Sequence, residues 1–378
     1  MKRIARLLTA LSLIGAAAAP LAAQTTNAVP PATEAPRPLK LDARSLPLGG
    51  ALKSPDVWLN YKSRFITDQG RVIDTGNNFV SHSEGQGYGM LLAVAANDRP
   101  VFDLLWGWTR ANLLVRGDDL FAWRWEPGQR PAVADMNDAT DGDLLIAWAL
   151  TEAAEFWNDT TLRIAARRIA VDIGRKLVIN KSAQGALLLP ALAGFAAEDR
   201  NDGPVVNLSY YVFPALTRLS LVAPEIDWNG IMQSGLALLK ATQGGPSHLP
   251  GDWTALKEGT PKAAQGFPNA FAYNAIRIPL YLSWAGIGER EHYEPFAAWA
   301  RHRRGQATIV DLASGRDIET YGETGYAAVP ALTLCVTDAQ SVPAELRSSS
   351  PSENYYPATL RALALIALQM RYPSCLRG

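Results

Sequence analysis

The stretch His82-Ser-Glu-Gly-Gln-Gly-Tyr-Gly-Met90 opens an apolar helical pattern with one carboxylate and three glycines. A helix start favours a negative group, because its first N–H groups are unpaired and lie at the positive end of the dipole. Glycine inside a helix costs up to ~1 kcal/mol relative to alanine, so three in one turn favour close approach to a ligand or another helix. We therefore interpret Glu84, with Gln86 and Tyr88, as part of a site rather than as a capping box with Ser81.

A second acidic stretch precedes another apolar helical pattern, at Ala139-Thr-Asp-Gly-Asp-Leu-Leu-Ile-Ala147. Four aspartates crowd this region: Asp135, Asp138, Asp141 and Asp143. Helix capping would explain two of them, but mutual repulsion raises the pKa values of crowded carboxylates. Such crowding indicates a ligand or neighbouring cations, for which Arg124 is a candidate. Asp141, between a threonine and a glycine, is the carboxylate that we favour for chemistry.

Composition excludes several classes of function. The chain has 378 residues, 48% of them hydrophobic, with 11 Trp, 12 Tyr and 10 Phe. Its 36 basic and 36 acidic residues balance, and no Lys/Arg cluster indicates a nucleic-acid partner. Two cysteines and four scattered histidines give no metal-ligand spacing, so we predict chemistry without a metal or cofactor.

The N-terminus is typical of an exported protein. A basic leader and an apolar run too short to span a bilayer predict a signal peptide over 1–23. A Pro/Ala-rich flexible linker is expected over 24–50 and a single catalytic domain over 51–378. We expect secretion across the inner membrane, a periplasmic or extracellular location, and no membrane insertion after cleavage.

Export would permit a disulfide, but Cys335 lies in the apolar run Ala331-Leu-Thr-Leu-Cys-Val336. We therefore expect a buried free thiol there rather than a bridge to Cys375.

Helical periodicity dominates the rest of the chain. Helices are predicted near 54–65, 88–96, 101–114, 145–156, 160–178, 209–221, 228–241, 271–285, 291–303, 325–336 and 355–371. The only good strand candidate is 307–311. The sequence predicts one all-α domain in which consecutive helices pack as antiparallel pairs. Four tryptophans in apolar helical rows are expected in its core: Trp58, Trp106, Trp148 and Trp284.

Several motifs in order resemble glycoside hydrolase family 8, over roughly residues 54 to 372. They are Ser83-Glu-Gly-Gln-Gly-Tyr-Gly-Met90, Trp123-Arg124, the 139–147 stretch, Asn207-Leu-Ser-Tyr-Tyr211, Pro250-Gly-Asp-Trp253 and Tyr273-Asn-Ala-Ile-Arg277. The resemblance is greatest to secreted endoglucanases encoded beside bacterial cellulose synthases. It implies an (α/α)6 barrel and hydrolysis with inversion.

The resemblance also implies roles for individual residues. Glu84 would be the general acid, and Asp141 would act at the scissile subsite. The remaining expected substrate-binding residues are Tyr88, Trp123, Asp143, Tyr210, Tyr211, Tyr273, Asn274 and Arg277.

One position departs from the family pattern. The usual general base is an aspartate where this chain has Asn274, and an amide cannot accept the proton of water. Another carboxylate could replace it, namely Asp141, Asp143 or Asp252, at the 6.5–9.5 Å spacing that inversion requires. Alternatively, the enzyme is weak, or the protein binds glucan without cutting it.

The predicted function is an endo-β-1,4-glucanase that trims cellulose during its synthesis and export. The partners implied are a β-1,4-glucan chain and a cellulose synthase complex. The alternatives left open are a hydrolase of lichenan, xylan or chitosan, and a non-catalytic glucan-binding protein.

Overall fold

Eleven α-helices dominate the computed structural model, which describes residues 39, 41–257 and 259–377. Their bounds are α1 Pro55–Phe65, α2 Ser83–Ala95, α3 Arg99–Asn112, α4 Thr140–Trp157, α5 Thr160–Lys176, α6 Phe213–Leu219, α7 Trp228–Ala241, α8 Arg277–Ala285, α9 Arg290–His302, α10 Ala328–Asp338 and α11 Tyr355–Arg371. Each coincides with a predicted helix. α6 and α8 begin later than predicted, because short 3-10 and strand segments occupy 208–210 and 270–271.

Local chemistry explains where several helices begin and end. Asp98, Asp159 and Asp227 cap α3, α5 and α7 by accepting hydrogen bonds from first-turn N–H groups. Asn158 and Gly286 end α4 and α8 in the left-handed conformation that terminates many helices.

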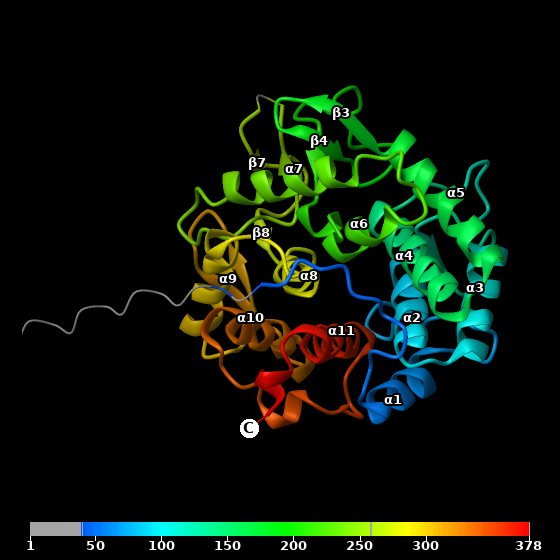
Figure 1. The fold of residues 1–378 in the computed structure, drawn as a ribbon. Coiled ribbons are helices and arrows are strands. Elements are labelled where there is room, and N and C mark those ends of the chain that lie inside the picture. The colour runs from blue at the N-terminus through cyan, green and yellow to red at the C-terminus, as the bar shows by residue number, and fades with distance from the viewer. Residues whose placement is uncertain (1–38, 40, 258, 378) are drawn as a thin grey trace, which may run out of the picture. The chain divides into compact units, whose positions relative to one another are not determined.

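Six of these helices form a closed inner ring (Figure 1). α2 packs on α4, α4 on α6, α6 on α8, α8 on both α10 and α11, and α11 returns to α2. The other helices lie outside it, with α1 against α11, α3 against α2, α5 against α4, α7 against α6 and α9 against α10. The inner helices are buried nearly all round, which explains their almost continuous apolar sequences.

One large hydrophobic core includes buried residues of both the inner ring and the outer helices. The four tryptophans predicted to lie there are buried, which confirms that prediction. Trp148 of α4 and Trp284 of α8 meet edge to face, with ring centroids 4.9 Å apart.

Ten short strands connect the helices in the described part of the chain. They are β1 Ser81–His82, β2 Arg124–Trp125, β3 Val178–Ser182, β4 Gly185–Leu188, β5 Val205–Val206, β6 Thr254–Ala255, β7 Lys262–Ala263, β8 Ala270–Phe271, β9 Thr308–Asp311 and β10 Asp317–Thr320. They pair antiparallel as β1-β2, β3-β4, β5-β6-β7 and β8-β9-β10. The predicted strand at 307–311 is confirmed as β9, whereas two-residue strands have no periodicity to reveal them.

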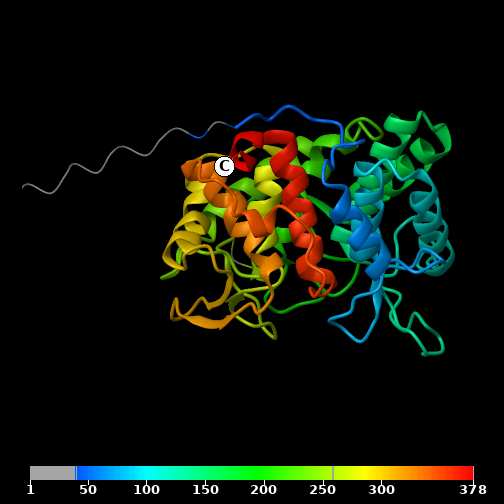
Figure 2. The same ribbon diagram turned by 90° about the horizontal axis from the view of Figure 1, so that it is seen from below.

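The segment before α1 is packed, which corrects the predicted linker. Leu48 is fully buried, and its N–H donates to Glu152 Oε2 at 2.9 Å. The Arg371 guanidinium donates to the carbonyl of Arg44 at 2.8 Å. In Figure 2 this blue segment crosses one end of the helices, while long loops extend from the other end. A flexible linker reaching residue 50 is therefore wrong; the signal peptide over 1–23 lies outside the described residues.

Cys335 and Cys375 form a disulfide, so the predicted free thiol is wrong. The C-terminal turn at Pro373–Leu376 lies against α10 and brings the two Cα atoms to 6.0 Å. This contact joins residues distant in sequence, so local patterning could not reveal it. Within residues 39, 41–257 and 259–377, no helix combines the length and the apolarity that crossing a bilayer requires.

Candidate active site

Close packing between the starts of α2 and α4 brings the two acidic stretches together. A Cβ on Gly142 would lie 2.0 Å from Ser83 Oγ and 2.7 Å from the backbone nitrogen of Glu84. A Cβ on Gly87 would lie 2.5 Å from that of Leu145. The glycines predicted to permit close approach therefore admit another helix, and they place Glu84 beside Asp141.

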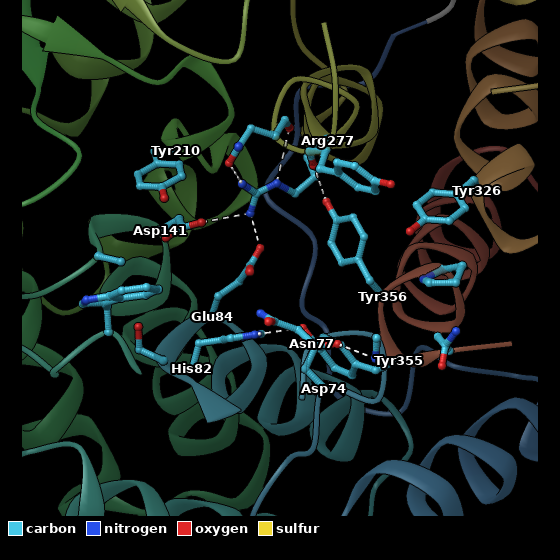
Figure 3. A pocket seen from close by; sticks show the side chains of 18 of the residues that line it. Asp74, Asn77, His82, Glu84, Asp141, Tyr210, Arg277, Tyr326, Tyr355 and Tyr356 are labelled. Atoms are coloured by element: carbon cyan, nitrogen blue, oxygen red, sulfur yellow. Dashed lines mark hydrogen bonds and ion pairs between the residues drawn. The ribbon is translucent and has the colours of Figure 1, made fainter. Parts of the chain in front are cut away.

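Arg277, at the start of α8, joins both acids (Figure 3). Its Nη1 contacts Glu84 Oε1 and donates to Asp141 Oδ2 at 2.9 Å. Its Nη2 donates to Ser209 Oγ at 3.0 Å and to Asn274 Oδ1 at 2.9 Å. The Glu84 side chain is 20% exposed, against 3% for each of the other two. Glu84 is therefore the member of this trio that solvent reaches most readily.

The trio contains two carboxylates and one cation. Burial, reinforced by the charge of Glu84, raises the pKa of Asp141 to about 6. Burial opposes the charge on Arg277, but Glu84 and Asp141 outweigh it and raise the pKa of the guanidinium further. One added proton would leave a neutral carboxyl beside a matched ion pair, so the trio is suited to holding a proton.

A cavity of about 600 Å³ opens over these residues. Tyr210 borders it on the Asp141 side, and Tyr326 and Tyr356 lie beyond Arg277 on the other side (Figure 3). Trp123 and the exposed Tyr273, which the sequence predicts to contact sugar, also line the cavity. Aromatic walls with polar groups between them suit pyranose rings, which have apolar C–H faces and polar edges.

His82 and Asp74 form a second polar pair in the cavity wall. His82 Nε2 lies 3.1 Å from Asp74 Oδ2. Burial opposes protonation of His82, but the hydrogen bond to Asp74 and the charge of Glu84 outweigh it and raise the pKa. His82 is therefore held by a hydrogen bond to Asp74 and lies close enough to Glu84 to feel its charge.

Several residues that line the cavity lie outside the motifs recognised in the sequence. They are Asp74, Asn77, Glu323, Tyr326, Asn354, Tyr355 and Tyr356. These residues come from connecting loops and from α11, far from the recognised motifs, and only the tertiary fold brings them to the cavity.

Three predicted substrate-binding residues do not line the cavity: Tyr88, Asp143 and Tyr211. All are fully buried, so direct substrate contact by their side chains does not fit the structure. The Tyr88 hydroxyl pairs with that of Tyr281. Asp143 Oδ1 accepts from the backbone N–H of Phe121 at 2.8 Å, and the Tyr211 hydroxyl accepts from that of Leu188 at 3.0 Å. These three buried side chains therefore contribute to the structure around the site rather than to its surface. Burial, reinforced by nearby Asp138, raises the pKa of Asp143.

The prediction that Arg124 is a counter-ion of the crowded aspartates is also wrong. Arg124 pairs with Glu126 at 2.9 Å, whereas Arg116 lies 3.7 Å from Asp138. Arg277 balances Asp141 instead, and its helix is remote in sequence. Gln86 is likewise structural: it accepts from Val72 N at 2.6 Å and donates to Thr109 Oγ1 at 2.8 Å.

Asn274 lines the cavity, with Asp252 behind it. Asp252 accepts backbone hydrogen bonds from Ala272 and Ala275, both at 2.9 Å, and the Asn274 amide at 3.3 Å. Asp252 therefore orders the loop that presents Asn274 and does not line the cavity. Among the described residues, no cluster of three or more His, Cys, Asp or Glu is arranged to hold a metal ion.

The chain belongs to family 8 of the glycosyl hydrolases, whose family model matches residues 50–370. An endoglucanase from Cellulomonas uda is 37% identical over 85% of this chain and 90% of its own length. The crystal structure of a family 8 endoglucanase from Klebsiella pneumoniae has a TM-score of 0.76 and 38% identity, covering 83% of this chain and 98% of that one. An endo-β-1,4-glucanase from Acetobacter xylinum has a TM-score of 0.74 and 33% identity, covering 85% and 98%. The protein is thus a glycoside hydrolase, and the predicted (α/α)6 barrel is confirmed.

Proposed function

We propose that the protein is an endo-β-1,4-glucanase that cuts internal bonds of cellulose with inversion. The observation that carries this proposal is the accessible carboxyl of Glu84, beside Asp141 and between aromatic cavity walls. Relatives named endoglucanase, similar over most of the chain, support the substrate class.

In the proposed mechanism, Glu84 protonates the leaving glycosidic oxygen. For this step Glu84 leaves Arg277 and carries the single extra proton of the trio, while Asp141 and Arg277 remain as an ion pair. A general acid must carry its proton when the substrate binds, and this arrangement keeps the buried Asp141–Arg277 ion pair intact.

Asp141 is the carboxylate that we propose as base. Of the three substitutes for the aspartate missing at Asn274, Asp141 lines the cavity, whereas Asp143 and Asp252 do not. Its pKa of about 6 makes it a stronger base than an ordinary aspartate. In the structure, Glu84 and Asp141 both contact Nη1 of Arg277. The two carboxylates are therefore closer together than the ~6.5–9.5 Å that inversion needs. Rotation of Glu84 toward the substrate opens this gap for water.

Asn274 supports a second candidate function, a glucan-binding protein with little hydrolysis. Its amide oxygen is bonded to Arg277, near the acid, where a base would be effective. The test compares wild type, Asn274→Asp and Glu84→Gln for reducing ends released from carboxymethyl cellulose. Wild-type turnover abolished by Glu84→Gln supports the enzyme; binding without release, converted to turnover by Asn274→Asp, supports the binder.

The same variant tests the base. Loss of activity in Asn274→Asp would show that the asparagine belongs to a relocated catalytic arrangement, as proposed. A large gain would instead show that wild type lacks a competent base. A panel of lichenan, xylan and chitosan tests the specificity, for which we expect the fastest hydrolysis on β-1,4-glucan.

We further propose export to the periplasm or beyond and a role in cellulose synthesis. The basic and apolar N-terminus supports export, and the resemblance to endoglucanases encoded beside cellulose synthases supports the role. Fractionation of cells that express the full chain tests the first proposal. Co-purification with a cellulose synthase complex tests whether that complex is a partner.

A further inference from the structure

A second cavity, of about 690 Å³, adjoins the catalytic one and has no part in the proposed reaction. We call it the side cavity. It lies between the end of α9, the segment before α10 and the 340–346 loop. Glu323 and Tyr326 line both cavities.

A stacked tyrosine pair forms the wall at this junction. The rings of Tyr321 and Tyr326 lie 19° apart in orientation, with centroids 4.3 Å apart. Tyr326 also contacts Tyr273 and Tyr356 of the catalytic cavity, at 6.2 and 6.0 Å between centroids. One aromatic cluster therefore borders both cavities, and ligands held in the two would lie close together.

The polar groups of the side cavity are available to a ligand. Arg304, Gln306, Gln340 and Ser341 are exposed, and their side chains make no hydrogen bond or ion pair with other described residues. Ala327, Ala331 and Leu334 supply small apolar surfaces beside them.

This lining indicates the class of ligand. Amides and a hydroxyl both donate and accept hydrogen bonds, as sugar hydroxyls require. The lining carries two cations, Arg301 and Arg304, and two anions, Glu323 and Glu345, so its charges balance and it favours neither an anion nor a cation. Apolar patches between polar groups match the alternating character of a neutral pyranose.

We propose that the side cavity is a second binding site for a β-glucan segment. This inference rests on the proposed function, because the glucan reaches the protein through the adjoining cleft. A polymer engaged at both sites binds more tightly than at either alone, whereas a short oligosaccharide gains nothing from the second site.

The test uses cellotetraose and carboxymethyl cellulose. In the Glu84→Gln background, which prevents turnover, calorimetric titration with cellotetraose is expected to give two sites per chain. Adding Gln306→Ala and Gln340→Ala weakens one site at least fivefold. In the otherwise wild-type enzyme, this pair raises KM for carboxymethyl cellulose several-fold and leaves kcat/KM for cellotetraose unchanged. Gln69→Ala, at an exposed glutamine that lines neither cavity, is the matched control.

A single cellotetraose site in the titration overturns the proposal, as does an unchanged titration in the double variant. A second variant, Ala331→Phe, narrows the side cavity without removing a polar group and must give the same loss in folded protein. Failure of the proposed function has a different result: wild type releases no product from carboxymethyl cellulose, while the titration still reports two sites.

Discussion

Two arginine–carboxylate clusters lie toward opposite ends of α4, and their difference separates chemistry from stability. At one end, Arg277 serves both Glu84 and Asp141. Farther along, Arg218 serves Glu152 alone, whose oxygens also accept from Trp148 Nε1 at 3.0 Å and Leu48 N at 2.9 Å. The second cluster is closed and balanced, whereas the first has an excess carboxylate that opens into a cavity. Arginine with acid is therefore not by itself a sign of a site; the unbalanced, accessible acid is.

The largest effect is expected at the open cluster. Glu84→Gln removes the acid's proton and should lower kcat about 10³-fold, with a small change in melting temperature. Reducing-end release and thermal unfolding measure the two. Glu198→Gln, at an exposed glutamate, should change neither. Retained activity in Glu84→Gln would refute the assignment of the acid.

At the closed cluster around Arg218, we expect substitution to lower stability rather than catalytic rate. Glu152→Ala leaves Arg218 buried without its partner and should cost about 3–5 kcal/mol of unfolding free energy. Denaturant unfolding measures this cost. Glu155 lies on the same helix as Glu152, and Glu155→Ala, which removes an exposed ion pair with Arg163 of α5, should cost under about 1 kcal/mol. Equal losses in the two variants would contradict the contrast drawn between buried and exposed pairs.

Asp141 should make stability depend on pH. Its pKa rises from 3.8 to about 6 on folding, so the native state binds more protons than the unfolded state between these values. Stability is therefore lost as pH rises through this window. Asp141→Asn removes this dependence. As the pH rises from 4 to 7, the free energy of unfolding of the variant should therefore increase by about 3 kcal/mol relative to that of wild type. Parallel denaturant titrations of the two proteins at several pH values measure this change. If the difference in unfolding free energy between variant and wild type did not vary with pH, the pKa of Asp141 would not be raised.

The smallest effect is expected at the cavity wall. Trp123→Ala removes an aromatic face that borders the open cluster and should weaken substrate binding by about 1 kcal/mol, or about fivefold in KM. Steady-state kinetics on cello-oligosaccharides test this, with kcat unchanged. A fall in kcat with constant KM would place Trp123 in the chemical step instead.

Much of the fold could be predicted from periodicity, and much of the site could not. Long helices such as α4 and α11 have a clear helical periodicity of apolar residues. The short strands and the disulfide depend instead on contacts between residues distant in sequence. Glu84 and Asp141 were detectable because glycine and acid crowd helix starts. Asp74 and Glu323 lie in loops without any such signal, and only the fold brings them to the cavity.

Sequence also overestimated substrate contact near the motifs. Tyr88 lies on the same face of α2 as Glu84, four residues earlier, but one turn deeper, where Arg277 and Tyr281 cover its hydroxyl. Asp143, two residues after Asp141 on α4, faces away from the cavity that Asp141 lines. A motif locates the turn, and the packing of neighbouring helices decides which of its side chains reach the ligand.

The packed segment around Leu48 has a practical consequence. Its hydrogen-bond partner Glu152 lies about 16 Å along α4 from Asp141. A surface or fusion partner attached on the N-terminal side of this segment would therefore be connected to the protein at the end remote from the catalytic cavity. Immobilised enzyme oriented this way should keep its groove facing the solution.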